Sequence, residues 1–205
     1  MTNDEAHWQR IYAARRPDET SWYQPIPTLS LELVDGLGLA HDAPIVDIGG
    51  GASTLVDHLV ARGYAALTVV DLAANALEHA KGRLGAAAST VEWIAGDVLE
   101  VPLGGPFALW HDRAVFHFLT DAGDREVYRR RLREHLCPGG HVILATFADD
   151  GPERCSGLPV VRHSEDALFA ALGPGFSRKG SRREVHRTPG GVAQRFVYVV
   201  AQREG

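Results

Sequence analysis

The sequence predicts an α/β fold built around a mostly parallel sheet with helices on both faces. From residue 45 onward, short apolar runs alternate with segments of helical periodicity, which is the pattern that βαβ units produce. The apolar runs are uninterrupted, as expected for strands that are buried on both faces. Two further strand-like runs close the chain around a Pro-Gly-Gly turn, so we expect them to pair as an antiparallel hairpin.

The expected elements follow one another in a regular order. Strands are expected at residues 45–48, 66–70, 91–94, 107–110 and 141–147, with the hairpin strands at about 181–187 and 192–201. Helices are expected from the glycine triplet to Gly63, at 73–84, from Asp121 to about Leu136, and from Ser164 to Gly173. Aspartate and serine are favoured N-caps and glycine is a favoured helix end, which sets these bounds.

Residues 1–40 differ from the rest of the chain. They carry tryptophan and tyrosine in a mostly helical segment that Pro25 and Pro27 interrupt. We expect residues 1–40 to cap a core of residues 41–205 within a single domain, residues 1–205. The length of 205 residues agrees with one domain, given that a domain usually has ~100–200 residues.

Composition excludes several classes of protein. Hydrophobic residues make up 45% and charged residues 23% of the chain, as in globular proteins, and no apolar run is long enough to span a membrane. The net charge of −5 argues against nucleic acid as a partner, and we expect the arginines of residues 129–133 to form a solvated helix face.

Two cysteines, Cys137 and Cys155, are too few for a disulfide scaffold, so a cytoplasmic location is expected. Cys155 has no nearby Cys or His, so no metal site is expected.

A glycine-rich turn follows the first expected strand. Residues 47–53 read Asp-Ile-Gly-Gly-Gly-Ala-Ser and lead into a helix, so the backbone there can approach a ligand and offer free N–H groups. Asp71 ends the next strand, 20 residues after Gly51, where an acid can reach a ribose hydroxyl. Thr54 replaces the third glycine of dinucleotide sites, and the carboxylate of Asp47 suits an ammonium group better than a phosphate. The pattern therefore predicts a ligand with a ribose, an adenine and a cationic amino-acid end.

These motifs resemble those of the class I S-adenosylmethionine (SAM) methyltransferases. The matching stretches are Asp47-x-Gly49-x-Gly51, Val70-Asp71, Gly96-Asp97-Val98 and Leu136-x-Pro138-Gly139-Gly140. The resemblance implies a Rossmann-like seven-stranded sheet and SAM as cofactor, with S-adenosylhomocysteine (SAH) as product. It would place Asp97 at the adenine amino group, Asp71 at the ribose and Asp47 near the methionine end. Leu72, Val98 and His111 are further expected cofactor contacts.

Aromatic residues of the N-terminal segment are candidates for covering the cofactor. Trp8, Trp22 and Tyr23 would exclude water and meet the positive sulfonium with their ring faces. Ordinary core packing of the same side chains is the alternative. Their position between proline-rich breaks favours a lid.

A polar stretch after the fourth expected strand holds the candidate catalytic residues. It lies at the carboxyl edge of the sheet, where α/β folds bind ligands. Arg113 would stabilise an anionic acceptor, His111 or His117 would assist deprotonation, and Asp112 would orient the arginine or act as a base. The alternatives are a structural Asp112–Arg113 ion pair and a packed His117.

The acceptor is predicted from a resemblance to the thiopurine methyltransferase-like group. Asp112-Arg113 and the loop 157–160 are similar to that group, although Ala114 stands where it has glycine. This implies a small-molecule methyl acceptor with a soft nucleophilic atom, such as a thiol, selenium or a metalloid, which needs little help from a base.

A second resemblance gives a different acceptor. Trp8 with Tyr12, followed by the Trp22-Tyr23 pair, is also similar to the small protein-lysine methyltransferases. Those enzymes carry lysine where Arg113 stands, so the arginine favours the small-molecule acceptor. A protein substrate and a non-catalytic SAM-binding module stay open as alternatives.

Overall fold

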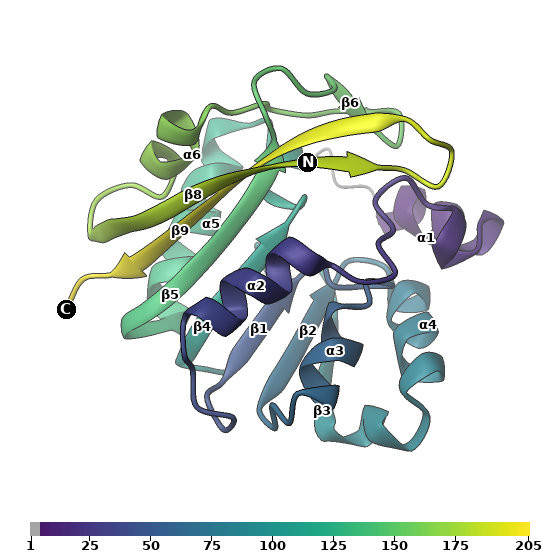
Figure 1. Cartoon of the computed structure of the whole chain (residues 1–205), viewed down its shortest axis with the longest axis horizontal. Helices are drawn as coiled ribbons and strands as arrows, with labels where there is room; N and C mark the ends of the chain where they lie inside the picture. The colour runs from purple at the N-terminus through teal and green to yellow at the C-terminus, as the bar shows by residue number, and fades with distance from the viewer. Residues whose placement is uncertain (1–4) are drawn as a thin grey trace.

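The computed structural model describes residues 5–205 and has the α/β architecture that the sequence predicts (Figure 1). Within these residues a seven-stranded sheet has the order β3-β2-β1-β4-β5-β9-β8. Its strands are β1 (Ile45–Ile48), β2 (Leu67–Asp71), β3 (Val91–Ala95), β4 (Phe107–Arg113), β5 (Leu136–Phe147), β8 (Phe176–Arg187) and β9 (Ala193–Arg203). The first five strands are parallel, and β9 pairs antiparallel with both β5 and β8. The expected C-terminal hairpin is confirmed.

Helices cover both faces of the sheet, as predicted. Helices α2 (Thr28–Gly36), α3 (Leu55–Ala61) and α4 (Ala74–Leu84) pack on one face, and α5 (Ala122–His135) and α6 (Glu165–Ala171) pack on the other. Ile45 belongs to the first core cluster and its neighbour Val46 to the second, because successive side chains of a strand point to opposite faces. Both faces are therefore apolar, which explains the uninterrupted hydrophobic runs.

The remaining elements lie around the carboxyl ends of the strands or connect the larger ones. They are α1 (Glu5–Ala14), the short 3₁₀ turns Pro17–Glu19, Gly85–Thr90 and Phe116–Phe118, and the small ribbon of β6 (Arg154–Cys155) and β7 (Leu158–Pro159). Helix α1 packs beside α4, where Asn75 Nδ2 donates to the carbonyl of Gln9 at 2.8 Å. In the described part of the chain, no helix has the length and apolar character needed to cross a membrane.

Two strands begin earlier than the sequence predicts. Leu136 already pairs with Phe107, and a register shift separates this pair from the regular pairing that begins at His141. The Pro-Gly-Gly stretch therefore starts β5 as an irregular extension. Strand β8 begins at Phe176, with a register shift between Arg178 and Gly180. After the buried Phe176, the next residues, 177–179, are polar and partly exposed because β8 is an edge strand, so they give no apolar signal.

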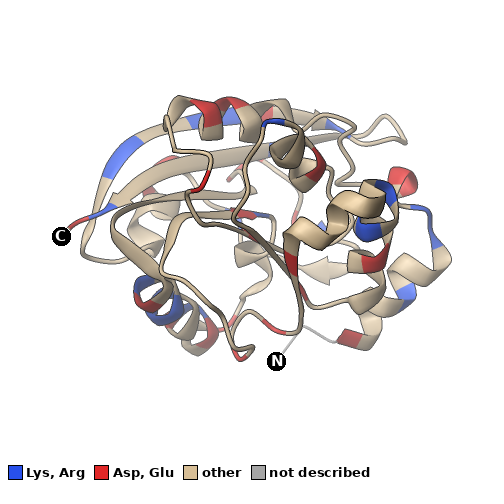
Figure 2. Ribbon diagram, turned by 90° about the horizontal axis from the view of Figure 1, so that it is seen from below, with Lys and Arg blue, Asp and Glu red and all other residues tan. Residues whose placement is uncertain are grey.

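Acidic and basic residues are interspersed along the ribbon in Figure 2. On α5, Arg129 and Arg133 pair with Glu126, and Arg130 lies 3.8 Å from Glu134. Arg129, Arg130 and Arg133 therefore lie on a helix face with its own acidic partners, as the sequence predicts. Arg131 differs, because its Nη2 donates to the Val101 carbonyl and its Nε is buried without a hydrogen-bond partner.

Candidate cofactor and acceptor site

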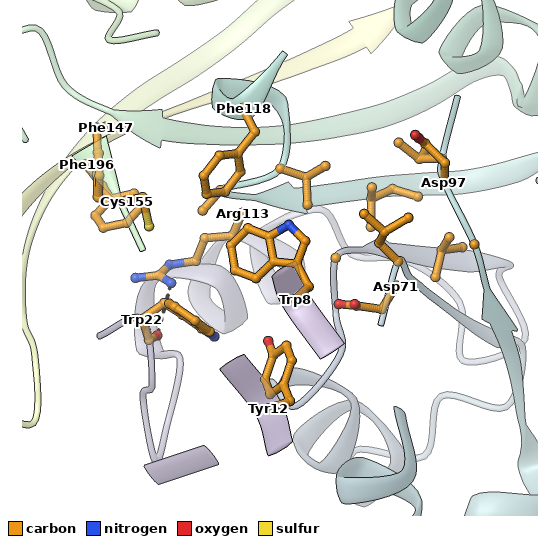
Figure 3. A pocket seen from close by; sticks show the side chains of 18 of the residues that line it. Trp8, Tyr12, Trp22, Asp71, Asp97, Arg113, Phe118, Phe147, Cys155 and Phe196 are labelled. Carbon is orange, nitrogen blue, oxygen red and sulfur yellow. Dashed lines mark hydrogen bonds between the residues drawn. The ribbon is translucent and has the colours of Figure 1, made fainter. Parts of the chain in front are cut away.

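A cavity of about 790 Å³, counted with its open mouth, lies at the carboxyl ends of the central strands (Figure 3). The ends of the strands and the residues just after them contribute small, aliphatic and acidic residues, namely Gly49, Asp71, Leu72, Gly96, Asp97, Val98 and Ala114. Aromatic residues of the N-terminal segment, of the turn after β4 and of strands β5 and β9 close the other side, namely Trp8, Tyr12, Trp22, Phe118, Phe147 and Phe196. The cavity thus has an acidic half and an aromatic half.

The glycine-rich turn has no room for side chains. Gly49 has φ +68°, and a Cβ there would lie 2.1 Å from Val115 Cγ2. A Cβ on Gly51 would lie 2.3 Å from Asp71 Oδ2. Glycine is therefore required at these two positions for steric reasons. Gly49 lines the cavity, and Gly51 instead lets the carboxylate of Asp71 come close to the turn.

The two acids of the cavity are held by backbone N–H groups beside them. Asp71 Oδ1 accepts a hydrogen bond from the N–H of Ala73 at 2.8 Å, and Asp97 Oδ1 accepts one from Leu99 at 2.8 Å. Burial, together with the nearby charge of Asp47, raises the pKa of Asp71 to about 7. A ligand that donates hydrogen bonds to Asp71 would stabilise its charged form.

Asp47 is buried beside an adjoining cavity of about 520 Å³. His111 Nδ1 donates to Asp47 Oδ1 at 2.7 Å, and His111 Nε2 lies 3.0 Å from Ser30 Oγ. The second carboxylate oxygen, Oδ2, is buried without a hydrogen-bond partner. Because an unpaired buried carboxylate oxygen is unfavourable, this atom suits a cationic ligand group. His111 holds Asp47 in place and lies outside the larger cavity.

The N-terminal aromatic residues meet edge to face over the cavity. The ring centroids are 5.8 Å apart for Trp8 and Trp22, and 5.9 Å apart for Tyr12 and Trp22. Trp8 and Trp22 line the larger cavity, whereas Tyr23 lines only the adjoining one. Tyr12 was not among the predicted site residues, although it lies one helical turn after Trp8 and so shares its face.

Arg113 is the cation of the aromatic half. Its Nε donates to the hydroxyl of Tyr198 at 2.8 Å, and its Nη1 donates to the carbonyl of Trp22 at 3.3 Å. The guanidinium lies over the Phe196 ring, 4.3 Å from the centroid, and Nη2 is 3.6 Å from Glu184 Oε2. Arg113 thus faces the cavity with its charge balanced by Glu184.

The structure does not support a catalytic role for Asp112. Its carboxylate is fully buried and accepts hydrogen bonds from the N–H groups of Val115 and Phe116 and from the Tyr128 hydroxyl at 2.6 Å. It lines neither cavity. The structural Asp112–Arg113 ion pair is also wrong, because Arg113 pairs with Glu184. Asp112 therefore stabilises the turn that follows β4 through these hydrogen bonds.

His117 is likewise placed away from the cavity. It is fully buried, and its Nδ1 accepts a hydrogen bond from the N–H of Phe147 at 3.3 Å. Burial lowers its pKa to about 3, so the ring is neutral. His117 is therefore a packed side chain, which is the alternative that the sequence leaves open. Its predicted role in deprotonating an acceptor is not supported.

Comparison with known proteins gives first the class of fold. One structure, described as "Conversion of a Disulfide Bond into a Thioacetal Group during Echinomycin Biosynthesis", has a TM-score of 0.75 at 17% identity over 96% of this chain and 90% of that chain. The 1,6-didemethyltoxoflavin-N1-methyltransferase of Burkholderia thailandensis, with bound 1,6-didemethyltoxoflavin and SAH, has a TM-score of 0.71 at 19% identity over 98% of this chain and 88% of that chain. The N-methyltransferase NodS of Bradyrhizobium japonicum WM9, in complex with SAH, has a TM-score of 0.68 at 14% identity over 98% of this chain and 100% of that chain. The fold is therefore the Rossmann-like fold of class I methyltransferases.

The sequence comparison agrees with the fold. Residues 45–140 match the family model described as a methyltransferase domain, from β1 to the irregular start of β5. No curated protein matches the chain. The matched segment contains the glycine-rich turn and both cavity acids. Together these findings support a SAM-dependent methyltransferase with SAM as its cofactor.

Proposed function

We propose that this protein is a SAM-dependent methyltransferase that acts on a small molecule with a soft nucleophilic atom. One observation carries the proposal: a buried, unpartnered carboxylate oxygen on Asp47 and two further acids, Asp71 and Asp97, adjoin an aromatic pocket that contains a buried cation. The acids suit the three polar parts of SAM, and the aromatic pocket suits an acceptor.

The cofactor would be held by residues at the ends of the parallel strands. Asp47 Oδ2 would accept from the ammonium group, Asp71 from the ribose hydroxyls, and Asp97 from the adenine amino group, with Leu72 and Val98 beside the adenine. SAM supplies an activated methyl group. The protein would bring the acceptor into line with it and exclude water.

The aromatic residues of the N-terminal segment would provide that exclusion. Trp8 and Trp22 lie over the cavity and would face the sulfonium. Tyr23 would instead cover the methionine end, since it lines the adjoining cavity. With residues 5–27 so placed, the acceptor half is a confined pocket, which favours a small molecule over a protein side chain.

The proposed function is tested by SAH release. Purified protein is incubated with SAM and a panel of thiols, selenite, tellurite and halides. We expect turnover with at least one member, and loss of turnover and of SAM binding in Asp71→Ala. Turnover with none of them, together with methylation of a protein in a cell lysate, would replace the proposal with a protein methyltransferase. SAM binding without turnover in either assay would indicate a non-catalytic module.

A further inference from the structure

The acceptor half of the cavity is mostly apolar, and among the described residues Arg113 is its one charged side chain and Gln194 adds an amide. Phe118, Phe147 and Phe196 form its wall, and Trp22 lies on the opposite side of the Arg113 guanidinium (Figure 3). Phe147 and Phe196 are in edge-to-face contact, with centroids 4.8 Å apart. Flat ring surfaces in this arrangement accommodate a flat ligand better than a compact, strongly hydrated ion.

One polar atom of this pocket is unused. The side chain of Arg113 is only 10% exposed, yet its Nη2 has no hydrogen-bond partner, whereas Nε and Nη1 are both paired. Glu184 Oε2 is 3.6 Å away, too far for a good hydrogen bond but close enough to balance the charge. Since buried N–H groups are rarely left unpaired, Nη2 is available to a hydrogen-bond acceptor on a ligand.

The position of Arg113 is fixed before any acceptor binds. The Tyr198 hydroxyl accepts from Arg113 Nε and donates to Glu184 Oε2 at 3.0 Å, and Gln24 Nε2 donates to Glu184 Oε1 at 2.8 Å. This chain of contacts joins β4, the C-terminal hairpin and the N-terminal segment. Arg113 is therefore a preorganised donor, which favours binding.

The acceptor half provides no base at neutral pH. Within residues 5–205, its other titratable lining groups are Tyr12 and Cys155. Burial raises the pKa of Cys155 to about 11 and holds the pKa of Tyr12 well above its usual range. Neither group takes a proton from a ligand, so an acceptor whose reacting atom must lose a proton before it attacks has to bind already ionised.

Resting on the proposed function, we propose that the acceptor is a planar aromatic molecule whose methylated atom is acidic and conjugated with the ring, bound as its anion against Nη2 of Arg113. Delocalisation over the ring keeps charge density low near Glu184. In the reaction, the lone pair of the anionic atom forms the bond to the methyl carbon of SAM. The carbon–sulfur bond breaks with its electron pair staying on sulfur, and no proton moves.

This assignment gives Arg113 a role in affinity more than in rate. Two opposite charges disappear during the transfer, so the ion pair with Arg113 is strongest before the reaction. An interaction that weakens toward the transition state lowers KM without raising kcat. Loss of Arg113 should therefore raise KM and leave kcat nearly unchanged.

Binding is measured first, with protein saturated by SAH. The probe that carries the soft atom of the proposed function is 4-nitrobenzenethiol, and 4-nitrophenol and 5-nitrobenzotriazole compare oxygen and nitrogen as the acidic atom. The anions of all three absorb light. We expect at least one anion to bind at pH 8. Arg113→Gln should bind it about 10-fold or more weakly, a loss of about 1.4 kcal/mol or more. Arg130→Gln, an exposed arginine of α5, should bind it like the wild type.

Turnover of the bound probe is measured next. Arg113→Gln should raise its KM about 10-fold and leave kcat within about threefold. If Arg113→Gln does not fold, Tyr198→Phe provides the test, since it removes only the hydroxyl that holds Arg113 and should also weaken binding. The proposal is overturned if no probe binds, if the tested variant binds as tightly as the wild type, or if cyclohexanethiol displaces the anion. Absence of SAH binding would instead overturn the proposed function.

Discussion

Replacing Asp71 by asparagine should make the ligand-free protein more stable and its hold on SAM weaker. The carboxyl group is buried, and burial raises its pKa from the ordinary 3.8 to about 7. A folded-state pKa above the unfolded one means that stability present at low pH is lost as the pH rises through 7. Asparagine has nearly the same shape and never carries this charge.

The size of the effect follows from the shift. At about 1.4 kcal/mol for each pKa unit, the buried charge destabilises the folded state by about 4 kcal/mol at pH 8 and by about 2 kcal/mol at pH 5. The hydrogen bond from Ala73 is weaker to an amide oxygen, which offsets about 1–2 kcal/mol. Asp71→Asn should therefore raise Tm by about 5–10 °C at pH 8, with little difference at pH 5.

SAM binding should change in the opposite direction. Hydrogen bonds to a charged acceptor contribute about 1.5–3 kcal/mol, so the affinity should fall by roughly 10- to 100-fold. Thermal unfolding at pH 5 and pH 8 and calorimetric titration with SAM measure both effects, with the exposed Asp42→Asn as a control. An unchanged Tm at pH 8 together with unchanged SAM affinity would refute the reasoning.

Three further substitutions test the local geometry. Gly49→Ala would bring a Cβ to 2.1 Å from Val115 Cγ2 at φ +68°. The unfolding free energy in urea should fall by roughly 1–3 kcal/mol, and SAM binding should be lost. Normal SAM binding would contradict the turn geometry. Ala114 has φ +76°, so Ala114→Gly should raise the unfolding free energy by about 1 kcal/mol, and a decrease would contradict that backbone strain. Asp112→Asn also removes a buried charge, but both carboxylate oxygens accept hydrogen bonds, so its NH2 group would face a donor of Phe116 or Tyr128. This loss should outweigh the removed charge and lower stability by roughly 1–3 kcal/mol, while SAM affinity stays within about twofold. A large loss of SAM affinity with normal stability would restore a direct role for Asp112.

The fold and the acidic half of the cavity could be predicted because their signals are local. A buried parallel strand gives an uninterrupted apolar run, as in residues 45–48, and the turn after it needs glycine for steric reasons. Asp71 and Asp97 follow directly because each ends or follows a strand of the same sheet edge. Each of these motifs directly follows the strand that positions it, so the strand pattern also places the motif.

The aromatic half of the cavity is harder to predict because its contacts are distant in the sequence. Tyr198 lies 85 residues after Arg113. Its hydroxyl reaches Arg113 only because β9 pairs with β5 in the folded sheet. Asp112 and Arg113 were both assigned to the site, yet adjacent residues of a strand point to opposite faces. The alternation left one of them, Asp112, inside the protein. The hydroxyl of Tyr198, within the apolar run of β9, is a signal in the sequence that points to a buried polar partner.

The central claim is that the methyl group of SAM goes to a small molecule. SAM with a radioactive methyl group is incubated with the protein and a native cell lysate, and the products are separated into small-molecule and macromolecular fractions. The structure predicts label in the small-molecule fraction, dependent on the protein and lost in Asp71→Ala. Label confined to protein or nucleic acid, or no transfer to either fraction, would contradict it.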